Sequence, residues 1–212
     1  MDCCSCRGIR RRILMTTLCI YCPEIEGQRD EAEKHFNARG IGVDFVRGIH
    51  AMSAGLLCHK PHGLNGTTDL INSYKHVGLC LSHYMCWSIL EAGKGSEGLI
   101  LEADAKLPID WHDRTEKVLA DAPDDWDIIL LGSSHTQDKE RTHIKGDLWE
   151  VKYPFCCHAY LVRQKALPIL LDVGRHVNMN VDIMLMKHVY PHLRVYTVLP
   201  RIVEQRFTEL PV

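Results

Sequence analysis

Short runs of apolar, β-forming residues alternate with segments of helical periodicity along most of the chain. The clearest runs are RILMTTLCIY (12–21), GLIL (98–101) and DWDIILLG (125–132). Strands that are apolar throughout are typical of a sheet covered on both faces, and the segments between them are long enough for helices. The pattern predicts an α/β fold with a mixed, mostly parallel sheet and helices on both faces.

The segments between these strands predict individual helices and loops. A helix is expected over 26–42, with Ala32, Phe36 and Ala38 on its inner side and Gly40 at its end. The 82–95 segment predicts a helix that begins with Ser82 as its cap and ends near Gly93. Its apolar spacing rests on Met85, Ile89 and Leu90. The Gly-, His- and Pro-rich stretch 51–70 is expected to be a loop, and the polar stretch 133–147 is expected to be a loop or an excursion. Further expected elements are a second strand at 43–49, a helix at 113–123, a strand and helix over 158–174, a helix at 180–190 and a strand at 194–200.

Length and charge limit the class of protein. A chain of 212 residues is sufficient for one domain, here predicted to span 1–212, with residues 1–11 as a flexible basic, cysteine-rich tail. The formal net charge of −2 argues against bulk electrostatic binding to nucleic acid or to a membrane surface. No apolar run approaches the roughly 18 residues of a membrane span. Because no small-residue cleavage site follows the apolar run at 13–22, we expect no signal peptide and a cytoplasmic location, in a bacterium or a virus-infected cell.

Ten cysteines are many for such a compartment. Cys80 and Cys86 lie in apolar helical surroundings and are predicted to be buried. An alternative interpretation is a zinc protein, in which metal is held by some of Cys3, Cys4, Cys6, Cys19 and Cys22. The spacing of these cysteines lacks a second matched pair, and Cys58 with His59 and His62 is equally incomplete.

Glu102 and Asp104 follow the GLIL strand. In open α/β sheets, ligands bind beyond the carboxyl ends of the strands. In an extended segment, residues i and i+2 share a face, so these two carboxylates are expected to converge on one cation, with Mg²⁺ or Mn²⁺ suited to hard oxygen ligands. Asp124 and Asp125 precede their strand and are assigned to the opposite edge of the sheet. No GxxxxGK[ST], GxGxxG or GxSxG motif follows a strand.

Several segments together resemble glycosyltransferase family 25, the lipopolysaccharide and procollagen β-galactosyltransferases. VGLCLSHYMCW followed by GLILEADA is similar to that family's G-C-x-L-S-H segment and its apolar strand ending in E-D-D-A. The opening strand and helix with Arg29, the HAYLVRQ segment, NVDIMLM with Asp182, and VLPRIVEQ ending in Gln205 follow in the family's order.

The resemblance implies a GT-A-type glycosyltransferase fold, a UDP-sugar donor, a divalent metal, and inversion at the anomeric carbon. By the same resemblance, Glu102 and Asp104 would bind the metal and the donor diphosphate, and Asp182 would be the catalytic base or a sugar contact. The residues implied to contact or line the donor site are Arg29, Ser82, His83, Ala103 and Gln205.

The chain departs from the family pattern in ways that leave two functions open. Ala103 replaces the middle Asp of E-D-D, and the first strand lacks the usual Asp that follows it. The first function is a metal-dependent inverting transferase that moves galactose or glucose to a hydroxyl of a glycan, or of a hydroxylated base in DNA. The second is a catalytically degenerate relative that acts as a binding protein.

Overall fold

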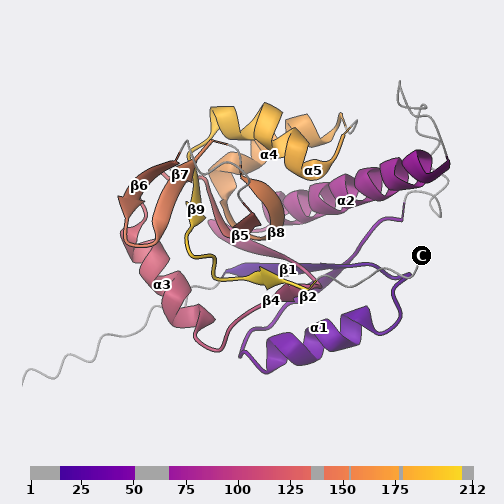
Figure 1. Ribbon diagram of the computed structural model, residues 1–212, viewed down its shortest axis with the longest axis horizontal. Helices are drawn as coiled ribbons and strands as arrows, with labels where there is room; N and C mark the ends of the chain where they lie inside the picture. The colour runs from indigo at the N-terminus through magenta and orange to yellow at the C-terminus, as the bar shows by residue number, and fades with distance from the viewer. Residues whose placement is uncertain (1–14, 51–66, 135–140, 153, 177–178, 207–212) are drawn as a thin grey trace, which may run out of the picture.

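The computed structural model describes residues 15–50, 67–134, 141–152, 154–176 and 179–206. An eight-stranded sheet forms the centre of the molecule, and helices cover both of its faces (Figure 1). The strands of this sheet are β1 (Thr16–Tyr21), β2 (Asp44–Arg47), β3 (Glu97–Glu102), β5 (Ile128–Ser134), β6 (Arg141–Lys145), β7 (Leu148–Val151), β8 (Phe155–Arg163) and β9 (Val195–Val198). A small second sheet pairs β4 (Ala105–Lys106) with β10 (Glu204–Gln205). The helices are α1 (Gln28–Asn37), α2 (Thr67–Ala92), α3 (Trp111–Asp121), α4 (Leu167–Gly174) and α5 (Val181–Met184), with short turns at Gln164–Ala166, Leu185–Val189 and Tyr190–His192.

The strand order is β2-β1-β3-β8-β5-β9-β7-β6. Strands β2, β1, β3, β5, β9 and β6 run in one direction, whereas β8 and β7 run against them. The predicted α/β class, with a mixed, mostly parallel sheet and helices on both faces, is confirmed. It agrees with the architecture that the family resemblance implies.

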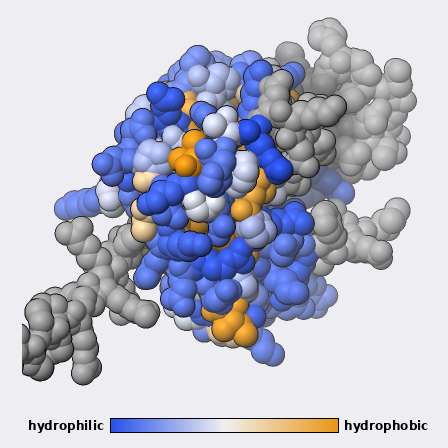
Figure 2. Space-filling view, turned by 60° about the vertical axis from the view of Figure 1, so that its left-hand side comes forward, coloured by the Kyte–Doolittle hydropathy of each residue, from blue (hydrophilic) through white to orange (hydrophobic). Residues whose placement is uncertain are grey.

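The strands are apolar on both faces because each face has its own core. Alternate residues such as Ile100 and Tyr160 pack under α2, α4 and α5, while Leu99 and Leu161 pack under α1 and α3. Figure 1 shows these two groups of helices above and below the sheet. The face of the molecule in Figure 2 is largely hydrophilic, with small, separate hydrophobic spots.

The helix expected from Ser82 is longer than predicted, because α2 already begins at Thr67. Ser82 is therefore not a helix cap. Its hydroxyl donates a hydrogen bond to the Gly78 carbonyl one turn earlier, at 2.7 Å, and this satisfies it inside the helix. The predicted helix end is confirmed, since α2 stops at Ala92, one residue before Gly93.

Other local predictions were wrong in part. Ala38 is exposed just after α1, and Met85 and Ile89 are 37% and 43% exposed on the outer side of α2. The stretch 133–147 contains β6 and the turn into β7 rather than a loop alone. Within the described part of the chain, no helix is both long and apolar enough to cross a membrane. The predicted tail, residues 1–11, lies outside the described residues.

Candidate active site

The candidate site lies where β1 and β3 end and where β8 and α5 begin. Residues at the start of β8 come close to Glu102 because β8 is antiparallel to β3, with Leu101 opposite Ala159. Ligands bind at this edge in open α/β sheets. The end of β3, the start of β8, α2 and α5 contribute side chains to this region.

Glu102 extends from the end of β3 towards α2. Its carboxylate oxygen Oε1 lies 3.4 Å from Nε2 of His83, and its side chain keeps 17% exposure. His83 is completely buried. Glu102 and His83 thus lie side by side, and a partly exposed carboxylate meets a buried imidazole.

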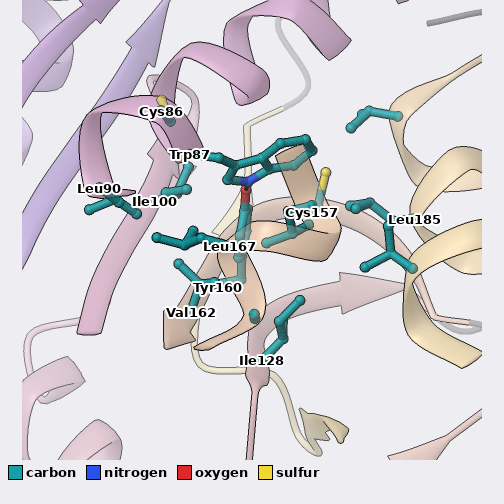
Figure 3. Close-up of a cluster of buried hydrophobic side chains, with 14 of the residues drawn as sticks. Cys86, Trp87, Leu90, Ile100, Ile128, Cys157, Tyr160, Val162, Leu167 and Leu185 are labelled. Carbon is teal, nitrogen blue, oxygen red and sulfur yellow. Dashed lines mark hydrogen bonds between the residues drawn. The ribbon is translucent and has the colours of Figure 1, made fainter. Parts of the chain in front are cut away.

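The other ring nitrogen of His83 belongs to a buried polar chain. Nδ1 lies 3.0 Å from the Tyr160 hydroxyl, which also accepts a hydrogen bond from the Trp87 indole at 2.8 Å. Figure 3 shows the Trp87 nitrogen directed at the Tyr160 oxygen, with Cys157 beside them. All three rings are at most 1% exposed. The orientation of the imidazole is therefore fixed from behind, on the side away from Glu102.

Cys157 joins Asp182 to this group. Its thiol donates to Oδ1 of Asp182 at 3.1 Å, and its sulfur lies 3.8 Å from Nε2 of His83. Burial raises the pKa of the Cys157 thiol well above its ordinary value, and the charge of Asp182 raises it further. Burial likewise raises the pKa of Asp182, against the opposing effect of the thiol hydrogen bond. Without a metal ion, the Cys157 thiol thus stays protonated beside Asp182.

An irregularity in β8 brings Cys157 into this position. Pairing with β5 shifts register here, and Cys156 has a φ of 64°, a left-handed conformation that is rare for a residue with a side chain. Cys157 packs with the core under α2, whereas Nε2 of the next residue, His158, contacts the carbonyl of Val203 on the opposite face at 3.1 Å. Gly132 makes room for that histidine, since a Cβ there would lie 2.1 Å from His158 Nε2.

Asp104 lies in the turn after β3 and has a different neighbour. Its Oδ2 accepts a hydrogen bond from the Gln205 amide at 2.9 Å. Its other oxygen, Oδ1, is buried and has no hydrogen-bond partner within the part of the chain that the structure describes, and the same holds for Nδ1 of His158. A buried carboxylate oxygen without a partner is costly unless a cation or a ligand donor meets it. Asp104 therefore fits the divalent metal or donor group that the family resemblance implies.

Glu102 and Asp104 influence each other electrostatically. Burial is the main cause, and the charge of Glu102 the second, of a pKa of about 6 for Asp104. The turn at Ala103 and Asp104 gives the two carboxylates different hydrogen-bond partners, His83 and Gln205 respectively. Their joint binding of one metal ion stays a prediction.

In the metal-free protein, Asp104 is expected to make folding stability fall as the pH rises from about 4 to about 6. The folded state binds a proton at Asp104 up to a pKa of about 6, against an ordinary 3.8, so stability is gained at low pH and lost above that pKa. The difference amounts to at most about 3 kcal/mol. Urea denaturation from pH 4 to 7 should show this fall in the wild type and not in Asp104→Asn. Equal pH dependence in the two proteins would contradict it.

The remaining predicted residues lie on the same edge or support it. Arg29 stacks over the rings of Tyr21 and Phe45, at 5.8 and 5.2 Å, and lines a pocket of about 150 Å³ at the end of β1. The Ala103 amide donates to the Ile20 carbonyl at 2.8 Å. Ser82 is 2% exposed, and its oxygen accepts a hydrogen bond from the Ile49 amide at 2.8 Å. The geometry thus gives Ser82 a role in tying the segment after β2 to α2.

Comparison with known proteins bears on the family. A protein of Anopheles gambiae described as a glycosyltransferase 25 family member is 26% identical over 175 residues, which are 73% of this chain and 30% of that protein. The chain is a distant relative of a glycosyltransferase family 25 protein. The resemblance predicted from the motifs is thereby confirmed, while the chain spans less than a third of that relative's length. No family model matches the chain.

Two solved structures show a weak overall likeness to the chain. One is a glycosyltransferase involved in glycosylation of the major capsid of PBCV-1, at 12% identity and a TM-score of 0.47, covering 86% of this chain and 81% of that one. The other is the inositol-1-phosphate CTP transferase from T. maritima, at 12% identity and a TM-score of 0.44, covering 87% and 85%.

Proposed function

We propose that the chain transfers a hexose, galactose or glucose, from a UDP-sugar to an acceptor hydroxyl with inversion at the anomeric carbon. The observation that supports this most directly is the gathering of Glu102, Asp104 and Asp182 at the carboxyl edge of the sheet. Burial is the main cause of a raised pKa in both other carboxyl groups, and the charge of Glu102 raises each of them further. Together with the relationship to family 25, this concentration of negative charge suits a metal-assisted diphosphate site.

Glu102 and Asp104 are the residues that would hold Mn²⁺ or Mg²⁺. When bound, the ion would stabilise the charge that grows on the departing diphosphate. Asp104 offers the unpartnered Oδ1, and Gln205 fixes the other oxygen so that the carboxylate keeps one orientation. Arg29 lines the neighbouring pocket at the end of β1, where its guanidinium could contact the donor.

Asp182 is our candidate for the general base. It occupies the first turn of α5, where the Asn180 side chain accepts a hydrogen bond from its amide at 3.4 Å. A raised pKa makes a carboxylate a better proton acceptor near neutral pH. Asp182 would accept the proton of the attacking hydroxyl as that oxygen approaches the anomeric carbon from the face opposite the diphosphate.

Binding of UDP, UDP-galactose and UDP-glucose to the full chain, with and without Mn²⁺, tests the donor site. We expect manganese-dependent binding of at least one of them, weakened about 10-fold or more in Asp104→Asn because a carboxylate ligand is replaced by a neutral amide. Asp113→Asn, at an exposed position of α3, is the matched control and should bind as the wild type does. Titration calorimetry gives the affinities. Absence of binding in every condition would overturn the proposal.

Ala103 supports a second candidate, a relative that binds the donor without transferring the sugar. The structure shows its backbone engaged with Ile20 and no carboxylate in the middle of the acidic turn. Donor binding without release of UDP in the presence of glycan and hydroxylysine-peptide acceptors would favour this candidate. A DNA acceptor would be recognised by a steep loss of binding as salt is added, whereas a glycan acceptor would bind nearly independently of salt.

A further inference from the structure

Three side chains of different chemistry converge in the candidate site, and Asp104 is not one of them. Nε2 of His83, Oε1 of Glu102 and Sγ of Cys157 all lie within 4.8 Å of one another. They come from α2, the end of β3 and the start of β8, so the sheet topology brings them together from three distant parts of the sequence. Among the described residues, they form the group of histidine, cysteine and acidic side chains close enough to share one metal ion.

Two of the three distances between these atoms are close to those of tetrahedral zinc coordination. With Zn–N and Zn–O near 2.0–2.1 Å and Zn–S near 2.3 Å, tetrahedral ligands lie about 3.4 Å apart for N and O and about 3.6 Å apart for N and S. The observed separations are 3.4 Å from His83 Nε2 to Glu102 Oε1 and 3.8 Å from His83 Nε2 to Cys157 Sγ. The third separation, between the ligand atoms of Glu102 and Cys157, is below 4.8 Å, against about 3.6 Å in such a site.

We infer that Cys157, His83 and Glu102 bind one Zn²⁺ ion. A thiolate and an imidazole select a thiophilic ion, whereas Mg²⁺ and Mn²⁺ prefer all-oxygen sites. Binding replaces the thiol proton by the metal, and the proton passes to solvent, with the Asp182 carboxylate next to the sulfur as the first acceptor. Three protein ligands leave a fourth position for water or for an oxygen of a substrate.

The surroundings of His83 suit a metal ligand. A zinc-bound histidine usually donates its other ring N–H to a fixed partner. Here Nδ1 lies 3.0 Å from the Tyr160 oxygen, which the Trp87 indole holds in place. In the zinc form, Nδ1 would carry the proton and donate it to Tyr160, so that the lone pair of Nε2 faces the ion. In the metal-free form, Nε2 would carry the proton and donate it to Glu102.

This inference goes beyond the proposed sugar transfer and does not depend on it. It assigns Glu102 to a zinc site with two ligands that the acidic motif does not contain. When zinc occupies that site, Glu102 is no longer available as the second Mn²⁺ or Mg²⁺ ligand named above, and Asp104 is the acidic residue left to contact a separate ion or the donor. Zinc binding and nucleotide binding can therefore be tested apart, through Cys157 and Asp104 respectively.

The test is titration of the metal-free full chain with Co²⁺ and Zn²⁺ in the absence of nucleotide. We expect one Co²⁺ per chain with the intense visible absorption of a tetrahedral site and a thiolate-to-cobalt charge-transfer band, both abolished by Zn²⁺. Cys157→Ser should lose the band and bind Zn²⁺ more than about 100-fold more weakly. Mutating a residue that only hydrogen-bonds to a metal ligand already lowers metal affinity about 10- to 100-fold. NMR of His83 should report the change of protonated ring nitrogen in the wild type.

Three variants serve as controls. Cys86→Ala removes a different buried thiol, which belongs to α2. Cys86 lies on the opposite side of the Trp87 ring from Cys157 in Figure 3, so this variant should bind zinc normally. Asp104→Asn should also keep zinc binding while it weakens the nucleotide. Joint replacement of Cys3, Cys4 and Cys6 by Ser excludes the N-terminal cysteines as the source of the band. An octahedral cobalt spectrum without charge transfer in the wild type, or an undiminished band in folded Cys157→Ser, would overturn the inference.

Discussion

Asp182→Asn is expected to lower kcat about 10²- to 10⁴-fold while the affinity for the UDP-sugar changes little. The amide keeps the shape of the side chain at the start of α5 but cannot accept the proton of the acceptor hydroxyl. An interaction needed only in the transition state affects kcat and kcat/KM together. Release of UDP from UDP-galactose, measured with whichever glycan or hydroxylysine peptide supports turnover, provides kcat, and calorimetry provides donor affinity.

Asp172→Asn is the matched control for this variant, because Asp172 is exposed on the neighbouring helix α4. It should leave both quantities unchanged. A kcat of Asp182→Asn within about threefold of the wild type would remove Asp182 as the base. A large rise in KM with an unchanged kcat would make it a sugar contact instead.

Trp87→Ala is expected to lower the free energy of unfolding by about 3–5 kcal/mol. The indole is completely buried among the side chains under α2 and α4, so its removal leaves a cavity. It also removes the hydrogen-bond donor that holds the Tyr160 hydroxyl. For a chain of this size, the melting temperature should fall by about 6–20 °C, since each kcal/mol corresponds to about 2–4 °C.

Met85→Ala tests whether the loss belongs to this position rather than to α2 as a whole. Met85 lies two residues away on the same helix and is 37% exposed, so its truncation should cost less than about 0.5 kcal/mol. Thermal and urea unfolding of both variants give the comparison. Similar losses in the two would show that the core around Trp87 is less closely packed than the structure indicates.

Strands buried on both faces were predictable from the sequence because they are apolar at every position. A strand with one exposed face would instead alternate polar and apolar residues. This is why the strand ending at Glu102 was correctly placed, and why the end of α2 near Gly93 was predicted from its breaker residue. The family motif then indicated which side chains to expect beyond that strand. The arrangement of these side chains around His83 could be seen only in the folded structure.

Cys157 could not be found in this way because its place depends on the direction of β8. Alternating strands and helices favour parallel strands, and in a parallel β8 the start of the strand would lie at the opposite edge from Glu102. Antiparallel pairing and the register shift near Cys156 reverse that outcome. The two adjacent cysteines in FCCHAY and the Tyr two residues after His158 were the available signals, and neither carries a spacing that specifies a metal site.

The contact between Asp104 and Gln205 has a consequence for the order of events during synthesis. The two residues are 101 positions apart in the sequence. Gln205 lies in β10, near the end of the described chain, and β10 pairs with β4 next to Asp104. A ribosome will have released β3 and its acidic turn long before Gln205 leaves the exit tunnel. The sheet can therefore begin to assemble while Asp104 still lacks its amide partner, and the acidic turn gains that partner only after residue 205 has emerged.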